Sequence, residues 1–131
     1  MRISKYVTLF LTALFIGIVV IERFPGVLID TEVPYEWLMF GLFKISLLDD
    51  ITHGLSGLLG VAALLAGYRF RVYYLMLIGG YYSLDAVFFL IYGLLVGELL
   101  IDNILLNIPH VGISFLVIVA LRYSIKSIEL K

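Results

Sequence analysis

The stretch from Ser46 to Gly67 is long enough to cross a lipid bilayer as one α-helix, yet it carries two carboxylates and a histidine near its start. On a helical wheel of about 100° per residue, its polar residues and several glycines fall in one stripe about 100° wide: Ser46, Asp49, Asp50, His53, Gly57, Gly60 and Gly67. Apolar residues occupy the other side: Leu47, Ile51, Leu55, Leu58, Ala62 and Leu65. Because a polar group turned toward hydrocarbon costs several kcal/mol, the stripe is expected to face other helices of a bundle.

The composition of the whole chain also favours a membrane protein. Of the 131 residues, 63% are hydrophobic and 15% are charged, which is less charge than a soluble domain of this length carries. The net charge of −1 gives no basic surface for nucleic acid. Cysteine is absent, which excludes disulfides, thiolate metal sites and cysteine nucleophiles. The length suits one integral membrane domain over residues 1–131.

Four apolar runs predict four transmembrane helices, over residues 6–21, 46–68, 72–96 and 104–122. Between the first two, the run VPYEWLMFGLFK mixes aromatic and acidic residues and predicts an interfacial segment. Pro109 is expected near the first turn of the last helix, where its missing N–H would have no partner. The predicted fold is an all-α membrane protein, a four-transmembrane-helix bundle with an interfacial segment between helices 1 and 2.

Basic residues predict the orientation of these helices. Seven of them fall on one side of a four-span arrangement: Arg2, Lys5, Arg69, Arg71, Arg122, Lys126 and Lys131. The positive-inside rule therefore places both termini in the cytoplasm and the protein in the plasma or inner membrane. The second and fourth helices then both run inward from the outer face, so His53 and His110 are expected at similar depth.

Ionisable residues within spans are candidate functional residues, because inserting them costs roughly 2.5–3.5 kcal/mol. Asp85 lies near the middle of the third span, one helical turn from Tyr81. A polar pocket opening to the outer face is predicted from six residues: Asp50, His53, Tyr81, Asp85, Asn107 and His110. Four glycines are predicted at close helix contacts: Gly57, Gly60, Gly79 and Gly93.

The two histidines allow three interpretations. They are hydrogen-bonded packing groups, or they bind a metal ion together with Asp50 or Asp85, or they are axial ligands of a b-type haem. Asp50-x-x-His53 has the one-turn spacing of a carboxylate–histidine pair, whereas the matching Asn107-x-x-His110 carries an amide. Absence of a bound cofactor is slightly favoured over either bound species.

A short series of motifs resembles a family of small four-helix bacterial membrane proteins of unknown function. Gly41-Leu42-Phe43-Lys44-Ile45-Ser46, followed by Asp50-x-x-His53, Gly57 and Gly60, is similar to the family motif G-L-F-x-V-S-x-x-H-N-x-x-H-x-x-x-G. Gly79-Gly80-Tyr81-Tyr82 and the segment from Asn103 to His110 resemble the starts of the family's third and fourth helices. This chain departs from the family motif at Asp49 and Asp50 and also at Asp85. The resemblance implies a four-helix architecture and no particular activity.

The leading functional hypothesis is a non-enzymatic membrane protein whose polar pocket organises the bundle or a partner. The expected partners are the lipid bilayer and a second copy of the chain or another membrane protein. One alternative is a metal- or haem-binding redox or transport component that uses His53 and His110. Another is passage of protons or small solutes involving Asp85.

Overall fold

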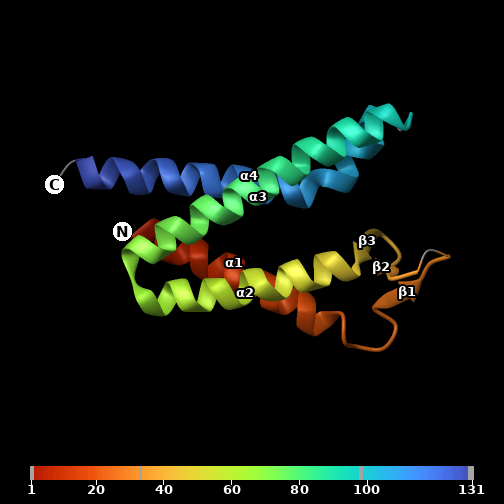
Figure 1. Ribbon diagram of the computed structural model, residues 1–131, viewed down its shortest axis with the longest axis horizontal. Helices are drawn as coiled ribbons and strands as arrows, with labels where there is room; N and C mark the ends of the chain where they lie inside the picture. The colour runs from red at the N-terminus through yellow and green to blue at the C-terminus, as the bar shows by residue number, and fades with distance from the viewer. Residues whose placement is uncertain (1, 33, 98, 130–131) are drawn as a thin grey trace.

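The structure is a computed structural model that describes residues 2–32, 34–97 and 99–129, with side chains omitted at 44, 102–103, 105–106 and 125–129. Four helices make up most of the chain: α1 (Arg2–Ile21), α2 (Leu47–Ala66), α3 (Tyr68–Leu95) and α4 (Leu100–Glu129). Each contains a stretch long and apolar enough to cross a membrane, which confirms the four apolar helices predicted from the sequence. Both chain ends lie at one end of the molecule, opposite the strands (Figure 1).

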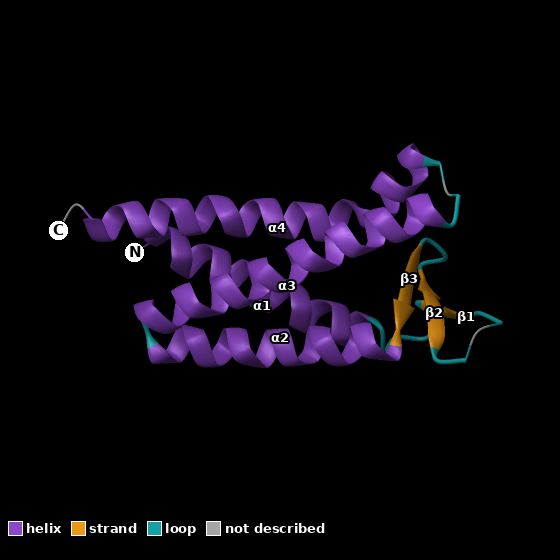
Figure 2. Cartoon of the chain, turned by 45° about the horizontal axis from the view of Figure 1, so that its top comes forward, coloured by secondary structure: helices purple, strands orange, loops and turns teal. Residues whose placement is uncertain are grey.

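The connection between α1 and α2, which includes the predicted interfacial segment, contains a small β-sheet that the all-α prediction had not included. Strands β1 (Leu28–Asp30), β2 (Glu36–Met39) and β3 (Phe43–Ser46) form an antiparallel sheet in the order β1-β2-β3. The turn between β2 and β3 contains Phe40 and Gly41, whose φ angles are +55° and +69°. Such positive φ values allow a tight hairpin to follow the twist of its strands. The sheet lies beyond the ends of α1 and α2 (Figure 2), and β3 leads directly into α2.

The helices pack most extensively as two pairs, α1 with α2 and α3 with α4. Side chains from three helices meet in the centre, where Leu11, Leu75 and Val117 are completely buried. Phe15 is also completely buried. This core joins the two pairs into one bundle because it contains residues from α1, α3 and α4.

Glycines permit the closest contacts between helices. A Cβ atom on Gly57 would lie 2.7 Å from Ile16 Cγ1 of α1, and one on Gly60 would collide with the Thr12 hydroxyl. A Cβ atom on Gly79 would lie 2.7 Å from Val117 Cγ1 of α4. Gly93 is buried as well. The three contacts at Gly57, Gly60 and Gly79 leave no room for a larger residue unless the helices separate.

Two helix boundaries differ from the prediction in an informative way. α3 begins at Tyr68, directly after Gly67, whose φ of +104° favours glycine. α4 begins at Leu100 and contains Pro109, so the proline lies well inside the helix and the expected first-turn position is wrong. Figure 2 shows that α4 changes direction in its N-terminal part, as expected where a proline removes a backbone hydrogen bond.

Candidate functional site

The first turn of α2 uses two residues of the polar stripe to cap the helix. The Ser46 N–H donates to Asp49 Oδ2 at 2.8 Å, and the Asp49 N–H donates to Ser46 Oγ at 3.3 Å. This reciprocal capping box satisfies backbone donors that have no partner within the helix. Ser46 and Asp49 therefore have a structural role at the beginning of α2.

Asp50 belongs to a small charged cluster at the end of α1. Its Oδ2 atom accepts a hydrogen bond of 2.7 Å from the Arg23 guanidinium. Glu22, which directly follows α1, is only 5% exposed and is hydrogen-bonded to Asp50. Burial, and after it the adjacent Asp50 carboxyl, raise the pKa of Glu22 to about 7. Glu22 therefore keeps its proton to a higher pH than an exposed glutamate does.

Asp85 and His110 form a polar contact between α3 and α4. His110 Nε2 lies 3.1 Å from Asp85 Oδ2, and their side chains are 26% and 20% exposed. The contact is an ion pair when the imidazole is protonated and a hydrogen bond when it is neutral. Ser114 donates to the His110 carbonyl at 2.7 Å, and Asn107, one turn before His110, is buried. The other ring nitrogen, His110 Nδ1, is buried without a hydrogen-bond partner among the described residues.

A column of aromatic rings connects the two histidines across all four helices. His53 stacks on Phe15 with ring centroids 5.8 Å apart, and Phe15 stacks on Tyr82 at 5.4 Å. Tyr82 then stacks on His110 at 5.6 Å. Phe89 covers another side of His110 at 6.0 Å. Phe15 and Tyr82 thus lie between the two imidazoles in the stack. His53 stacks on Phe15, whereas His110 stacks on Tyr82.

The structure therefore divides the six predicted pocket residues among separate places. Asp85, His110 and Asn107 lie together on α3 and α4, whereas His53 lies at the far end of the aromatic column. Asp50 faces Arg23, and Tyr81 lines a groove between α2 and α3. The side chain of Asn103 lies outside the described residues. Of the described residues, no group of three or more histidines and acidic side chains is placed to hold a metal ion.

Four important residues escaped the sequence reasoning: Phe15, Glu22, Arg23 and Tyr82. Glu22 and Arg23 are charged residues directly after the first apolar span, and this position could have identified them as candidates. Phe15 and Tyr82 resemble any other aromatic residue in a span, so only their three-dimensional placement identifies them.

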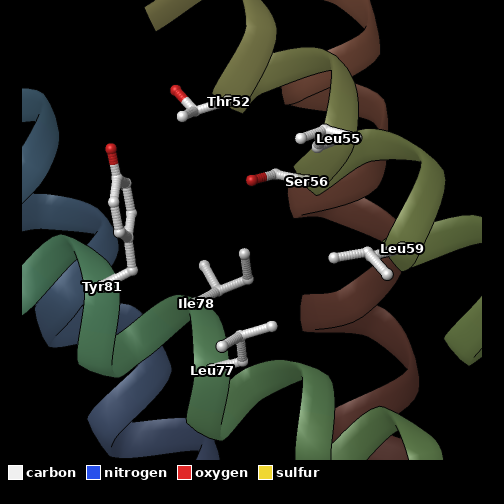
Figure 3. A pocket seen from close by; sticks show the side chains of 7 residues that line it. All are labelled: Thr52, Leu55, Ser56, Leu59, Leu77, Ile78 and Tyr81. Atoms are coloured by element: carbon white, nitrogen blue, oxygen red, sulfur yellow. The ribbon is translucent and has the colours of Figure 1, made fainter. Parts of the chain in front are cut away.

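The groove between α2 and α3 has a volume of about 160 Å³ and an almost entirely apolar lining. Seven residues line it: Thr52, Leu55, Ser56, Leu59, Leu77, Ile78 and Tyr81. The Ser56 hydroxyl is directed into the groove, and the Tyr81 ring lies along its side with the hydroxyl toward Thr52 (Figure 3). The Thr52 hydroxyl donates to the Asp49 carbonyl at 2.9 Å, so its oxygen retains the capacity to accept a hydrogen bond.

Comparison of the chain with protein-family models, with curated proteins and with solved structures finds no significant match.

Proposed function

We propose that this chain is a multi-pass membrane protein with both termini in the cytoplasm. The supporting observation is the surface of the helices, on which large apolar side chains are widely exposed. Leu58, Leu65 and Leu84, for example, are 66%, 84% and 74% exposed. A protein in water would bury most such contiguous apolar surface, whereas lipid stabilises it.

A reporter fused after Lys131 tests this orientation. The seven basic residues on one side predict activity from a reporter that functions in the cytoplasm and none from one that requires export. The same pair of reporters fused after residue 98, in the predicted outer connection, should give the reverse pattern. Activity of the exported reporter after Lys131 would overturn the orientation.

We further propose that the protein is non-enzymatic and that it binds a proton at the Asp85–His110 pair. The observation that carries this proposal is the 3.1 Å contact between the carboxylate and the imidazole within the helices. Ionisable groups held there by a partner on another helix commonly serve proton transfer or switching. The ionisable side chains inside the helices gather in the half of the bundle nearer the sheet. Among the side chains that the structure describes, these carboxylates and imidazoles are Asp49, Asp50, His53, Asp85 and His110.

That distribution favours proton binding from one side over passage across the membrane. Toward the end that carries the termini, the core combines Leu75, Val117 and Ala120 with the buried hydroxyl groups of Thr12 and Tyr74. Among the helical side chains that the structure describes, no carboxylate or imidazole lies on that side. The ionisable groups therefore support proton binding at the pair more than a continuous path across the bundle.

The decisive experiment is a pH titration of the histidine ring signals by NMR, with His53 and His110 assigned by substitution. Asp85→Asn should shift the midpoint of the His110 titration, because it removes the charged partner. Asp50→Asn, which alters a carboxylate in the other cluster, should leave that midpoint unchanged. A His110 signal that does not titrate, or that is insensitive to Asp85→Asn, would overturn the proposal.

A second candidate function is organisation of the bundle for a partner, in which the Asp85–His110 contact is only structural. The position of the contact favours this candidate, because the contact joins α3 to α4. A second hydrogen bond joins the same two helices, since the Tyr68 hydroxyl donates to the Ser124 carbonyl at 3.0 Å. Under this candidate, a double variant that combines Asp85→Asn with His110→Gln preserves stability and function alike. Under proton binding, the same double variant preserves stability and loses the pH response.

A further inference from the structure

The groove between α2 and α3 lies between two helices that we propose to span the membrane, and it is open along one side. Its walls are formed by leucine and isoleucine side chains, and its polar members are three hydroxyl groups. At this depth the surrounding medium consists of lipid acyl chains. We propose that the groove binds one acyl chain of a membrane glycerolipid and that the Ser56 hydroxyl donates to the ester carbonyl. This inference rests on the proposed insertion of the helices into a membrane.

The order of residues along the groove matches the order of groups in a glycerolipid. The charged Arg23–Asp50 contact identifies the headgroup level, because an exposed guanidinium belongs near water. Thr52 is two residues further along α2, about 3 Å deeper. Leu59 is another seven residues along, about 10 Å deeper. Hydroxyl groups thus lie near the charged level, and leucines lie where an acyl chain continues into the membrane.

Ser56 supplies the donor that an ester carbonyl can use. The proton of Thr52 is already donated to the Asp49 carbonyl, so the Tyr81 hydroxyl, which is hydrogen-bonded to Thr52, donates its own proton to the Thr52 oxygen. Ser56 is only 7% exposed, and its hydroxyl is directed into the apolar groove (Figure 3). A hydroxyl that faces hydrocarbon without a partner is unfavourable, and a lipid carbonyl would satisfy it.

The volume of the groove suits a chain segment. A cavity of about 150 Å³ lined by apolar side chains holds one benzene molecule, so about 160 Å³ accommodates several methylene groups. Bulky headgroups do not fit between these helices, so they remain at the level of Asp50.

Photocrosslinking in vesicles tests the proposal. The full chain is reconstituted in phosphatidylcholine vesicles containing a small fraction of phosphatidylcholine with a photoactivatable group on one acyl chain. Labelled positions are then mapped by mass spectrometry. We expect labelling to concentrate at Leu59 and Leu77, and Leu59→Trp should largely abolish it by filling the groove. Leu58→Trp, on the adjacent exposed face, is the matched control and should leave this labelling unchanged.

An ester lipid and an ether lipid with the same photoactivatable chain then test the role of the hydroxyl groups. The ether lipid lacks the carbonyl oxygen, so we expect the ester lipid to label the groove about fivefold more, as one hydrogen bond allows. Ser56→Ala should remove this difference without abolishing labelling of Leu59, whereas Tyr81→Phe should leave the difference in place.

The outcomes separate this inference from the proposed membrane insertion. Equal labelling at Leu58 and Leu59, with no effect of Leu59→Trp, would show only unspecific lipid contact at the surface. That outcome would overturn the proposal of acyl-chain binding in the groove and would leave the proposed membrane insertion standing. Equal labelling by ester and ether lipids would overturn the hydrogen-bonded carbonyl. Absence of labelling at all exposed leucines would overturn insertion and the groove together.

Discussion

The two helix pairs of this bundle are held together in different ways. α1 and α2 approach through glycines, with Gly57 against Ile16 and Gly60 against Thr12. α3 and α4 also have one such contact, at Gly79, but they add the Asp85–His110 contact at 3.1 Å. Within the helices, the first pair therefore depends mainly on shape, and its charged cluster of Glu22, Arg23 and Asp50 lies at the end of α1. The second pair depends also on the protonation of side chains inside the helices. Enlarging an interior residue should chiefly disturb α1–α2, whereas changing an interior charge should chiefly disturb α3–α4.

The largest expected effect is from Gly60→Leu. The new side chain would collide with Thr12, whose hydroxyl is already fixed by a 2.7 Å hydrogen bond to the Thr8 carbonyl. Overpacking of this kind costs about 1–3 kcal/mol or more, and it should clearly lower the thermal unfolding midpoint in detergent. Gly57→Leu should behave similarly because of Ile16.

Gly54→Leu is the matched control for these two substitutions. A Cβ atom on Gly54 would meet nothing within 4 Å, so this variant should remain near wild-type stability. If all three leucine variants lose the same stability, the shape-dependent contact between α1 and α2 is misassigned.

The next effect concerns the histidines. His110→Ala leaves the Asp85 carboxylate without its imidazole partner, and a broken interhelical contact of this kind costs about 1–2 kcal/mol in lipid. His53→Ala removes an imidazole that stacks on Phe15 but leaves no carboxylate behind, so it should cost less. Unfolding of both variants in detergent at one pH measures the difference. A greater loss for His53→Ala would contradict the assignment of the polar contact to α3–α4.

A pH dependence is expected from the end of α1. The pKa of Glu22 is raised from 4.5 to about 7 by burial and by Asp50. The folded chain therefore binds this proton more tightly than the unfolded chain, so stability should fall as the pH rises from about 4.5 to about 7. Glu22→Gln should flatten this part of the stability curve because glutamine cannot lose the proton and its amide can donate to Asp50.

Glu32→Gln provides the control for that measurement, since Glu32 is an exposed carboxylate on the same connection. Unfolding midpoints of the three proteins between about pH 4 and about pH 8 compare them directly. An unchanged slope in Glu22→Gln would show that another group causes the pH dependence.

The smallest effect is expected from Arg23→Gln. The side chain of Arg23 is 62% exposed, and exposed ion pairs typically contribute about 0.2–1 kcal/mol. The loss of stability should therefore be small and should diminish further in high salt. A loss as large as that of Gly60→Leu would show that the Glu22–Asp50–Arg23 cluster holds α1 and α2 together more strongly than the glycines do.

The sequence predicted the helices better than the contacts between their polar groups. The helical wheel of α2 agrees with the observed burial, because Gly57 and Gly60 are buried and the apolar side from Leu47 to Leu65 is exposed. The wheel rests on the rule that a helix in lipid keeps its polar groups on one side, and the observed burial follows that rule. The strands escaped because they are only three or four residues long, which is too short for a clear alternation.

The partners of the candidate site were less predictable for a different reason. The pairing of Asp85 with His110 depends on the rotation of α3 against α4, and no pattern within either helix specifies that angle. The same is true of Phe15, which enters the aromatic column from α1 between residues of two other helices. Predicting that Glu22 lies beside Asp50 would have required knowledge of how the chain returns from α1 to α2 through the sheet.

The unequal length of the helices has a consequence for the membrane itself. α1 and α2 have 20 residues each, and α3 has 28, which corresponds to about 30 Å and about 42 Å. In the membrane arrangement that we propose, a hydrocarbon layer about 30 Å thick would match the shorter helices and α3 would lean, in keeping with its oblique course relative to α2 (Figure 1). A thicker bilayer would favour a more upright α3 and a thinner one a more inclined α3. Bilayer thickness would thereby act on the angle between α2 and α3, and through that angle on the width of the lateral opening between them.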